Sequence, residues 1–324
     1  MGDPAGISPE LTAKIAALAE ARAAAHIVIV GDRRMFDEGA KVAGVAVDVD
    51  MVGAHDPLPA DAGRPAFVDL AHLDPATVRR GVASREGGQF ALANYGHALQ
   101  MVAAGRAQAV CFTPFNKQSM RMALPSYDDE IRFTAGVLGV SGPATEFNVL
   151  DRLWNARVTS HVPLSKVASM LTIDAVVDAL ELTAASLRAA GFEPPRIAVA
   201  GLNPHAGDGG NFGREEIDVI APAIERARAR GVPAEGPFPA DTVFVRAQRG
   251  DFDAVLTMYH DQGQIAMKLM GFDRGVTVLG GFPFPICTPA HGTAYEIAGK
   301  GIANLGATRA AVLLAAEMAL RVAR

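Results

Sequence analysis

The sequence predicts an α/β protein with a largely parallel sheet that is covered by helices on both faces. Short apolar runs alternate with helical stretches along the chain, an order typical of parallel strands joined by crossover helices. The chain has 324 residues, which favours about two domains. Half of the residues are hydrophobic and 20% are charged, which excludes a disordered protein.

The expected strands are short apolar runs that stop at glycine, proline or polar residues: His26–Val30, Ala107–Phe112, Arg196–Ala200 and Phe252–Met258. Helical periodicity predicts helices over Pro9–Ala25, Gly88–Ala104, Gly213–Arg230 and Thr308–Arg321. The first of these helices has Ser8 as its expected N-cap and Pro9 at its first position. Two extended runs, Ala144–Leu150 and Trp154–His161, flank a short polar turn and indicate an antiparallel insertion.

Composition excludes several classes of protein. Lys and Arg number 30 against 35 Asp and Glu, so the net charge is −5 and the chain lacks the basic field that binds nucleic acid. Its two cysteines cannot form a disulfide framework, which favours a reducing compartment. No run approaches the roughly 18 apolar residues that cross a bilayer, and no signal peptide is recognised. We therefore expect a cytoplasmic protein that binds neither nucleic acid nor membrane.

Several common catalytic motifs are missing from the sequence. No G-x-G-x-x-G follows an early strand, no G-x-x-x-x-G-K-[ST] is present, and G-x-S-x-G is also missing. These patterns would indicate a Rossmann cofactor site, a P-loop and an α/β-hydrolase nucleophile, respectively. Cys111 lies inside an apolar run and is expected to be a core residue rather than a nucleophile.

Three histidines follow β-like runs, at positions where chemistry is common in α/β proteins. His161, His205 and His260 each come a few residues after such a run and beside Pro, Gly or Asp. Active sites of open α/β sheets lie just beyond the carboxyl ends of the strands. Three converging imidazoles would hold a divalent cation and leave positions open for substrate. Because the gaps between them are 44 and 55 residues, three unrelated loop histidines remain an alternative on the pattern alone.

Several segments resemble the 4-hydroxythreonine-4-phosphate dehydrogenase family. The most specific is Gly201–Asp218, GLNPHAGDGGNFGREEID, and Met258–Gly263 with Lys268 matches as well. The opening Gly2–Glu10 and the segment Pro237–Thr242 also fit, so the likeness covers essentially the whole chain. The resemblance implies two α/β/α domains of the isocitrate and isopropylmalate dehydrogenase type, with the active site in the cleft.

The resemblance also implies an organisation for these domains. Residues 1–120 with 285–324 would form the first domain, and residues 121–284 the second, with the metal site and the dimer contacts. In that family a first strand precedes the loop that corresponds to Gly2–Glu10, and no such strand stands before Gly2 here. The family is homodimeric, and one subunit supplies two of the metal-binding histidines while its partner supplies the third.

The resemblance implies roles for residues of this chain that match functional positions of the family. His161, His205 and His260 fall on the family's three metal ligands. Lys268 falls on a substrate-binding lysine and is also a catalytic candidate. Asp241 and Asp261 lie beside these elements and would orient His or Lys side chains or relay a proton.

A second resemblance concerns the segment Ala290–Asn304, which is similar to the cofactor loop of isopropylmalate dehydrogenases. In that superfamily the loop wraps the adenosine half of the dinucleotide. Backbone groups of Gly292, Thr293 and Ala294 would approach the adenine, and Asn304 closes the motif. Glu296 occupies an acidic position that accepts hydrogen bonds from a ribose hydroxyl and repels the 2′-phosphate of NADP, so NAD is the expected cofactor.

The chain departs from the vitamin B6 enzymes of the family at substrate-binding positions. A His and a Thr become Glu130 and Ile131, an Asn becomes Thr277, and an Arg becomes Ile286. Loss of a bidentate Arg removes an interaction of roughly 1.5–3 kcal/mol with an anion. Either Lys117, Arg132 or Arg274 takes over the phosphate, or the substrate differs, and we favour a different substrate.

The expected function is therefore an NAD- and divalent-metal-dependent dehydrogenase that oxidises a secondary alcohol of a phosphorylated hydroxy acid, with decarboxylation of the resulting 3-oxo acid. The expected substrates are threonate or erythronate 4-phosphates, or 4-hydroxythreonine 4-phosphate. The metal would be Zn, Mg, Mn, Co or Ni. One alternative is a carboxylated cis-dihydrodiol dehydrogenase of aromatic catabolism. Alternatives from other classes are a non-catalytic protein that binds NAD and an acid, and a metal-dependent hydrolase, which has no use for a cofactor loop.

Overall fold

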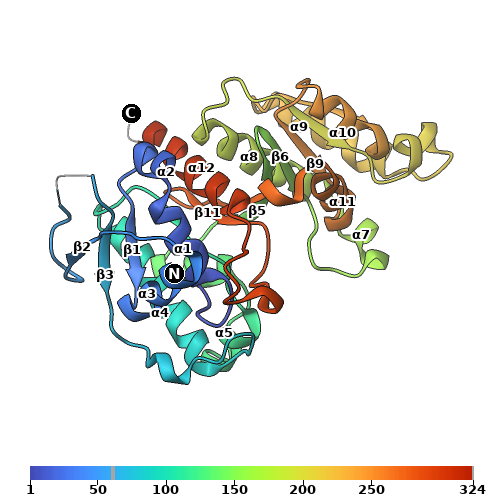
Figure 1. The fold of residues 1–324 in the computed structure, drawn as a ribbon. Coiled ribbons are helices and arrows are strands. Elements are labelled where there is room, and N and C mark those ends of the chain that lie inside the picture. Colours follow the sequence, from blue (N-terminus) through green and yellow to red (C-terminus); the bar gives the residue numbers. More distant parts are fainter. Residues whose placement is uncertain (60–62, 323–324) are drawn as a thin grey trace. The chain divides into compact units, whose positions relative to one another are not determined.

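The computed structural model describes residues 1–59 and 63–322 and divides the chain into two compact units (Figure 1). The first comprises Met1–Ser141 and Phe282–Arg324, and the second Gly142–Gly281. Residues 121–141, which the sequence analysis places in the second domain, thus lie in the first unit. There the Tyr95 hydroxyl lies 2.6 Å from the Thr134 hydroxyl, which joins two helices of that unit.

The first unit contains a three-stranded parallel sheet in the order β1-β3-β2, and a further parallel pair of β4 with β11. Its strands are β1 (Val28–Gly31), β2 (Asp50–Val52), β3 (Ala66–Asp69), β4 (Val110–Cys111) and β11 (Ile286–Pro289). Its helices are α1 (Ser8–Ala17), α2 (Ala19–Ala24), α3 (Arg33–Ala43), α4 (Arg85–Ala103), α5 (Lys117–Ala123), α6 (Glu130–Leu138) and α12 (Gly306–Val322), with short 3₁₀ turns at Pro75–Thr77 and Tyr295–Ile297.

The single helix predicted over Pro9–Ala25 is two helices. Leu18 is extended, with φ −73° and ψ 116°, and separates α1 from α2. The prediction of Ser8 as N-cap is also wrong, because α1 begins at Ser8 itself. The Ser8 hydroxyl accepts a hydrogen bond from the Gly2 N–H at 2.7 Å and contacts the Thr113 hydroxyl, so it is engaged away from the helix N–H groups.

The second unit contains a six-stranded mixed arrangement in the order β10-β5-β6-β9-β7-β8. The strands are β5 (Thr145–Leu150), β6 (Leu153–Arg157), β7 (Ile197–Ala200), β8 (Ala234–Phe238), β9 (Ala254–Thr257) and β10 (Val276–Gly280). The predicted antiparallel insertion is confirmed, because β5 pairs antiparallel with both β6 and β10. The pairs β6–β9, β9–β7 and β7–β8 are parallel.

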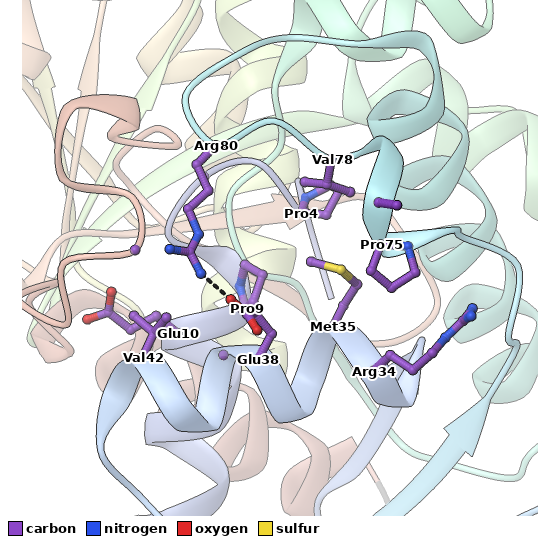
Figure 2. A pocket seen from close by; sticks show the side chains of 14 residues that line it. Pro4, Pro9, Glu10, Arg34, Met35, Glu38, Val42, Pro75, Val78 and Arg80 are labelled. Atoms are coloured by element: carbon purple, nitrogen blue, oxygen red, sulfur yellow. Dashed lines mark hydrogen bonds and ion pairs between the residues drawn. The ribbon is translucent and has the colours of Figure 1, made fainter.

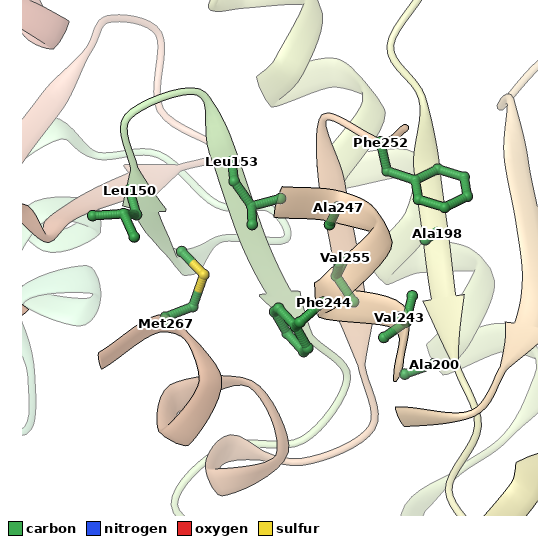
Figure 3. Packing of buried hydrophobic residues seen from close by; sticks show 10 residues of the cluster. All are labelled: Leu150, Leu153, Ala198, Ala200, Val243, Phe244, Ala247, Phe252, Val255 and Met267. Atoms are coloured by element: carbon green, nitrogen blue, oxygen red, sulfur yellow. The ribbon is translucent and has the colours of Figure 1, made fainter. Parts of the chain in front are cut away.

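Helices cover both faces of this sheet. They are α7 (Leu164–Met170), α8 (Ile173–Ala189), α9 (Ala221–Ala229), α10 (Ala240–Gln248) and α11 (His260–Gly271), with a 3₁₀ turn at Phe272–Arg274. On one face, Val243 and Phe244 of α10 and Met267 of α11 pack against strand residues such as Val255 (Figure 3). Helix α8 packs with α9 and contacts β6, β9 and β10. The strand-to-helix alternation of the sequence therefore produces layers, as predicted.

Polar N-caps begin many of the helices, as the local sequence dictates. In each case the side-chain oxygen accepts a hydrogen bond from an N–H of the first turn, which would otherwise have no partner. The caps are Asp32 of α3, Ser84 of α4, Asn116 of α5, Asp129 of α6 and Thr172 of α8.

Candidate functional site

The strands that precede the three predicted metal ligands lie side by side in the second unit. β6 leads to His161, β9 to His260 and β7 to His205, and the three strands are parallel neighbours in the order β6-β9-β7. Their carboxyl ends therefore meet at one edge of the sheet. Backbone pairing continues past the strands, since the N–H of Thr159 donates to the carbonyl of Met258 at 3.1 Å. This pairing brings the residues after β6 and β9 together.

His161 and His260 form a pair at this edge. Their ring centres lie 5.5 Å apart, so one cation can contact a nitrogen of each ring. His161 has a φ of 53°, in the left-handed region that non-glycine residues rarely adopt and that is enriched at functional positions. Nδ1 of His260 lies 2.7 Å from an oxygen of Asp261, which leaves the other ring nitrogen for a ligand. The Asp261 carboxylate thus contacts the Nδ1 side of the His260 ring.

His205 lies on an unusual backbone. Five consecutive residues have positive φ and form a left-handed turn: His205 (54°), Ala206 (52°), Gly207 (83°), Asp208 (45°) and Gly209 (64°). Each non-glycine residue in this conformation costs roughly 1–2 kcal/mol, so the surrounding contacts must hold the turn in place.

The Glu216 carboxylate supplies such contacts by bonding to Leu202 and Asn203 of the loop. Its side chain is 3% exposed and belongs to a π-helical turn, Glu216–Ile220, where the sequence predicted the start of a regular helix. One carboxylate oxygen accepts the N–H groups of Leu202 and Asn203, both at 2.7 Å. The other accepts the Asn203 side-chain amide at 3.0 Å. The carboxylate therefore fixes the chain immediately before His205.

Gln262 connects this loop to the His260 helix. Its carbonyl oxygen accepts the N–H of Met258 at 2.7 Å, and its amide donates to the carbonyl of Gly201 at 2.7 Å. One side chain thus spans the ends of β9 and β7. The beginnings of the two histidine-bearing segments are fixed relative to each other by this bridge.

Arg157 anchors the segment that carries His161. The guanidinium, in a residue that is only 6% exposed, donates to Ser160 at 2.9 Å, to Asn148 at 2.6 Å and to Glu146 at 3.1 Å. Burial lowers the pKa of Arg157, and Glu146 partly opposes this effect. The Gln264 side chain of α11 bonds to the same Asn148 oxygen. Arg157 therefore ties the end of β6 to the helix that carries His260.

Within one chain, the structure brings together two of the three predicted metal ligands. Among the described residues, no three His, Cys, Asp or Glu side chains lie close enough to hold a metal ion. The His205 ring instead lies 6.1 Å from the Phe212 ring. Paired, accessible imidazoles are donors that suit a divalent transition metal, so His161 and His260 fit such an ion provided that a further ligand completes the set.

The other candidates of the second unit occupy separate elements. Lys268 is exposed on α11, about two turns beyond His260 on the same helix. Asp241 is exposed in the first turn of α10. Thr277 lies on β10 and is the register partner of Asn148 on β5.

In the first unit, the structure gives Glu130 a partner that the sequence did not predict. Glu130 is buried at the start of α6, and its carboxylate lies 3.2 Å from the ammonium of Lys117. Lys117 is thereby engaged with a carboxylate rather than held free for a phosphate. Tyr127 is buried beside this pair, and burial followed by the Glu130 charge raises the pKa of its phenol. Ile131 is half-buried on the same helix, and Ile286 is fully buried at the start of β11.

The predicted cofactor loop, residues 290–304, is irregular apart from its 3₁₀ turn. Gly292, Glu296 and Asn304 are exposed. The Thr293 carbonyl accepts the N–H of Ile7 at 3.1 Å, and Ala294 has a φ of 44°. The loop therefore presents its acidic position to solvent while other groups hold it against the beginning of the chain.

A cavity of about 350 Å³ adjoins this loop in the first unit (Figure 2). The walls are largely apolar, with Pro4, Pro9, Met35 and Val78 among them, and Gly299 of the loop contributes to the rim. Two arginines line it, of which Arg80 pairs with Glu38. No predicted site residue lines this cavity.

Sequence reasoning missed Glu216, Gln262 and Arg157, although two of them lie inside motifs that it quoted. Glu216 stands in the long glycine-histidine segment and Gln262 follows His260 and Asp261. A carboxylate or amide within such a loop is a signal for a residue that satisfies backbone groups. Arg157 had a weaker signal, the one charge in a strand that is otherwise uncharged.

The comparison with known families decides the assignment. The family described as Pyridoxal phosphate biosynthetic protein PdxA matches residues 23–315. The chain belongs to the PdxA family. A protein of Rhizobium meliloti (strain 1021), provisionally named 4-hydroxythreonine-4-phosphate dehydrogenase 2, is 64% identical over 98% of this chain and 92% of its own length. A protein of Symbiobacterium thermophilum, provisionally named a D-threonate 4-phosphate dehydrogenase, is 36% identical over 98% of this chain and 95% of its own.

A solved PdxA-family structure has the same fold. The 4-hydroxythreonine-4-phosphate dehydrogenase of Klebsiella pneumoniae superposes with a TM-score of 0.85 at 33% identity, covering 98% of this chain and 96% of that chain. The expected family and fold class are therefore confirmed. The names of these relatives support an oxidoreductase. Across the described residues, no helix is both long and apolar enough to cross a membrane.

Proposed function

We propose that this PdxA-family chain is an NAD- and divalent-metal-dependent dehydrogenase that oxidises a secondary alcohol of a phosphorylated hydroxy acid and promotes decarboxylation of the 3-oxo acid. The observation that carries the proposal is the His161–His260 pair, with ring centres 5.5 Å apart at the carboxyl edge of parallel strands. Bound there, a divalent cation would supply Lewis-acid chemistry at the substrate hydroxyl, and NAD would accept the hydride.

The chain's own residues support the other requirements of this reaction. Asp261 orients the His260 ring through Nδ1. Lys268 places an ammonium on the same helix, and an ammonium suits a phosphate or carboxylate oxygen of the substrate. In the cofactor loop, the exposed Glu296 would accept hydrogen bonds from a ribose hydroxyl and repel a 2′-phosphate, which favours NAD over NADP.

We further propose that the enzyme is a homodimer in which His205 of the partner subunit completes the metal site. Helix α11 and the turn after it expose three large apolar side chains: Ile265 (60% exposed), Leu269 (84%) and Phe272 (57%). Exposed apolar groups at this spacing mark one face of a helix and suit contact with a second copy. Because this face lies on the His260 helix, a partner bound there would lie near the histidine pair.

Subunit complementation tests the shared site. His161→Ala and His205→Ala should each abolish activity and weaken Co²⁺ binding, measured by calorimetry. If each site combines His161 of one subunit with His205 of the other, mixed dimers contain one intact site, so an equal mixture should recover about a quarter of wild-type activity. Recovery of none, with mixed dimers verified by mass spectrometry, would contradict the shared site.

A matched pair of variants tests the dimer surface. Leu269→Glu should convert the protein to monomers, measured by light scattering, because it places a charge in the apolar face. Leu320→Glu on α12 is the control, since Leu320 is similarly exposed at 64% and lies on the first unit. Dissociation by both variants or by neither would contradict the assignment of this face.

The most specific part of the proposal is the identity of the substrate. The Glu130–Lys117 pair at 3.2 Å favours a substrate other than that of the vitamin B6 enzymes, because a buried carboxylate repels an anion and its partner lysine is already engaged. We expect turnover of D-threonate or D-erythronate 4-phosphate to exceed that of 4-hydroxythreonine 4-phosphate. The rise in NADH absorbance measures turnover of each substrate in the presence of Mg²⁺, Mn²⁺, Co²⁺, Ni²⁺ or Zn²⁺. The same assay with a carboxylated cis-dihydrodiol tests whether the chain is instead a cis-dihydrodiol dehydrogenase. Greater turnover of 4-hydroxythreonine 4-phosphate would overturn the substrate choice.

A further inference from the structure

We propose that three residues near the start of the chain, Asp3, Glu10 and Lys14, act as positioning residues that clamp the cofactor loop in the shape that receives the dinucleotide. The relevance of this clamp to NAD rests on the proposed function. The clamp itself consists of contacts within the first unit, between residues 3–14 and residues 293–303.

Lys14 and Glu10 hold the end of the loop. The Lys14 ammonium donates to the carboxylate of Glu10 at 2.6 Å and to the carbonyls of Gly301 and Ala303 at 3.1 and 2.8 Å. An ammonium has three donors, so these contacts use all of them. The same Glu10 oxygen accepts the N–H of Ala303 at 2.8 Å.

The burial of this pair separates it from ordinary surface ion pairs. The Glu10 side chain is 2% exposed and that of Lys14 is 18% exposed. Exposed i,i+4 pairs contribute little, because water and salt screen them. Here the charges are largely withdrawn from water, and the loop backbone bonds to the Lys14 ammonium and to Oε1 of Glu10, whereas Oε2 of Glu10 is buried without a hydrogen-bond partner among the described residues. Loss of Lys14 therefore leaves two loop carbonyls and a buried carboxylate without the hydrogen bonds that the ammonium donates.

A second set of contacts holds the other end of the loop. The Tyr295 hydroxyl donates to the Asp3 carboxylate at 2.9 Å, and Asp3 is 1% exposed. The N–H of Ile7 donates to the Thr293 carbonyl. Gly6 allows this approach, since a Cβ there would lie 2.7 Å from the Thr293 oxygen.

The clamp faces inward and leaves the proposed ligand groups facing outward. Glu296 and Asn304, which belong to the predicted dinucleotide site, are exposed, whereas Ala303, whose carbonyl accepts from Lys14, is buried. The loop has only one short 3₁₀ turn of its own, so its shape depends on these outside contacts. A loop held in its bound shape loses less conformational freedom on binding and therefore binds more tightly.

The test compares Lys14→Met with Arg33→Met. Arg33 also forms an i,i+4 ion pair, with Asp37 at 2.8 Å on α3, but that pair touches no cofactor-loop residue. Lys14→Met should raise the Kd of NAD, measured by calorimetry, and the KM for NAD by about tenfold or more, while kcat at saturating NAD changes by less than about twofold. Lys14→Arg should recover part of the affinity, and Arg33→Met should match wild type.

Amide hydrogen exchange of the protein without nucleotide gives a readout that does not depend on the reaction. The N–H groups of residues 301–304 should exchange faster in Lys14→Met than in wild type. In Arg33→Met they should exchange at the wild-type rate. If Lys14→Met does not fold, Tyr295→Phe, which removes one hydroxyl, is measured in the same way for residues 293–297. Unchanged exchange together with unchanged NAD affinity overturns the clamp. Wild-type protein that binds no NAD overturns the proposed function instead, and the exchange comparison then decides the clamp alone.

Discussion

Two irregular loops carry most of the proposed chemistry, and they are held in different ways. The loop of residues 290–304 in the first unit is held by hydrogen bonds with Asp3, Ile7, Glu10 and Lys14, which lie outside it. From the loop of residues 201–213 in the second unit, Glu216 accepts three hydrogen bonds, while Glu215 and Gln262 take part in one each. The first loop is thus held by contacts spread over several side chains, whereas most of the side-chain contacts to the second loop meet at one buried carboxylate. We expect the second arrangement to be more fragile.

The largest effect is expected at Glu216, which accepts three hydrogen bonds from the second loop. Glu216→Ala removes three hydrogen bonds to a carboxylate and leaves the N–H groups of Leu202 and Asn203 without their acceptor. We expect the free energy of unfolding to fall by about 3 kcal/mol or more, measured by urea denaturation. Glu225→Ala, which breaks an exposed pair with Arg228, is the control and should change it by less than about 1 kcal/mol. Equal effects would remove the contrast between the loops.

Two glycines of the left-handed turn separate crowding from backbone strain. At Gly207, φ is 83° and an added Cβ would lie 2.7 Å from a Glu216 oxygen, whereas at Gly209, φ is 64° with open space. Gly207→Ala should therefore destabilise the fold by about 2–3 kcal/mol, and Gly209→Ala by about 1 kcal/mol. Denaturation midpoints measure both. Similar values would mean that the Glu216 contact adds nothing to the strain.

Gly6→Ala tests how much displacement the distributed loop tolerates. The added methyl would press on the Thr293 carbonyl, while the contacts of Lys14 and Asp3 remain available to hold the rest of the loop. We expect a loss of about 1–2 kcal/mol, measured by thermal unfolding. Gly136→Ala on α6 is the control, because a methyl there meets nothing within 4 Å and should stabilise the helix by about 0.5–1 kcal/mol. A larger loss than that of Glu216→Ala would reverse the comparison.

The smallest effect is a pH dependence in the first loop. Burial raises the pKa of Asp3 above 3.8, against the opposing hydrogen bonds from Ala5 and Tyr295. The folded state therefore binds the proton more tightly than the unfolded state, and wild type loses stability as pH rises from 3.8 through the raised pKa. The stability of wild type minus that of Asp3→Asn should fall across this window, measured by urea denaturation at several pH values. A difference that rises or stays flat would contradict the burial argument.

Much of the fold followed from local pattern. Apolar runs and periodicity predicted β1, β7, β9, α4 and α12, because burial on two faces and helical amphipathicity leave direct traces in the sequence. The break at Leu18 left no such trace, since neither Gly nor Pro marks it. The boundary near residue 141 depends on contacts of α6 with α4, which are tertiary and invisible to periodicity.

The candidate site was likewise predictable from the sequence only in part. That His161, His205 and His260 follow strands was evident, but strand order was not, and only the order β6-β9-β7 shows which rings approach each other. The engagement of Lys117 by Glu130 likewise depends on the packing of α5 near α6. Residues that bind backbone, such as Glu216 and Lys14, are the hardest to predict, because their partners carry no side-chain signature.

The turn at residues 205–209 has a consequence for chemical synthesis. Its five positive φ values are those that a D-amino acid prefers, so the energetic preference between mirror-image residues is inverted there. D-Alanine at position 209, where there is open space, should fit better than L-alanine and better than the flexible glycine. Semisynthesis would thus make a short stretch of opposite handedness a stabilising element.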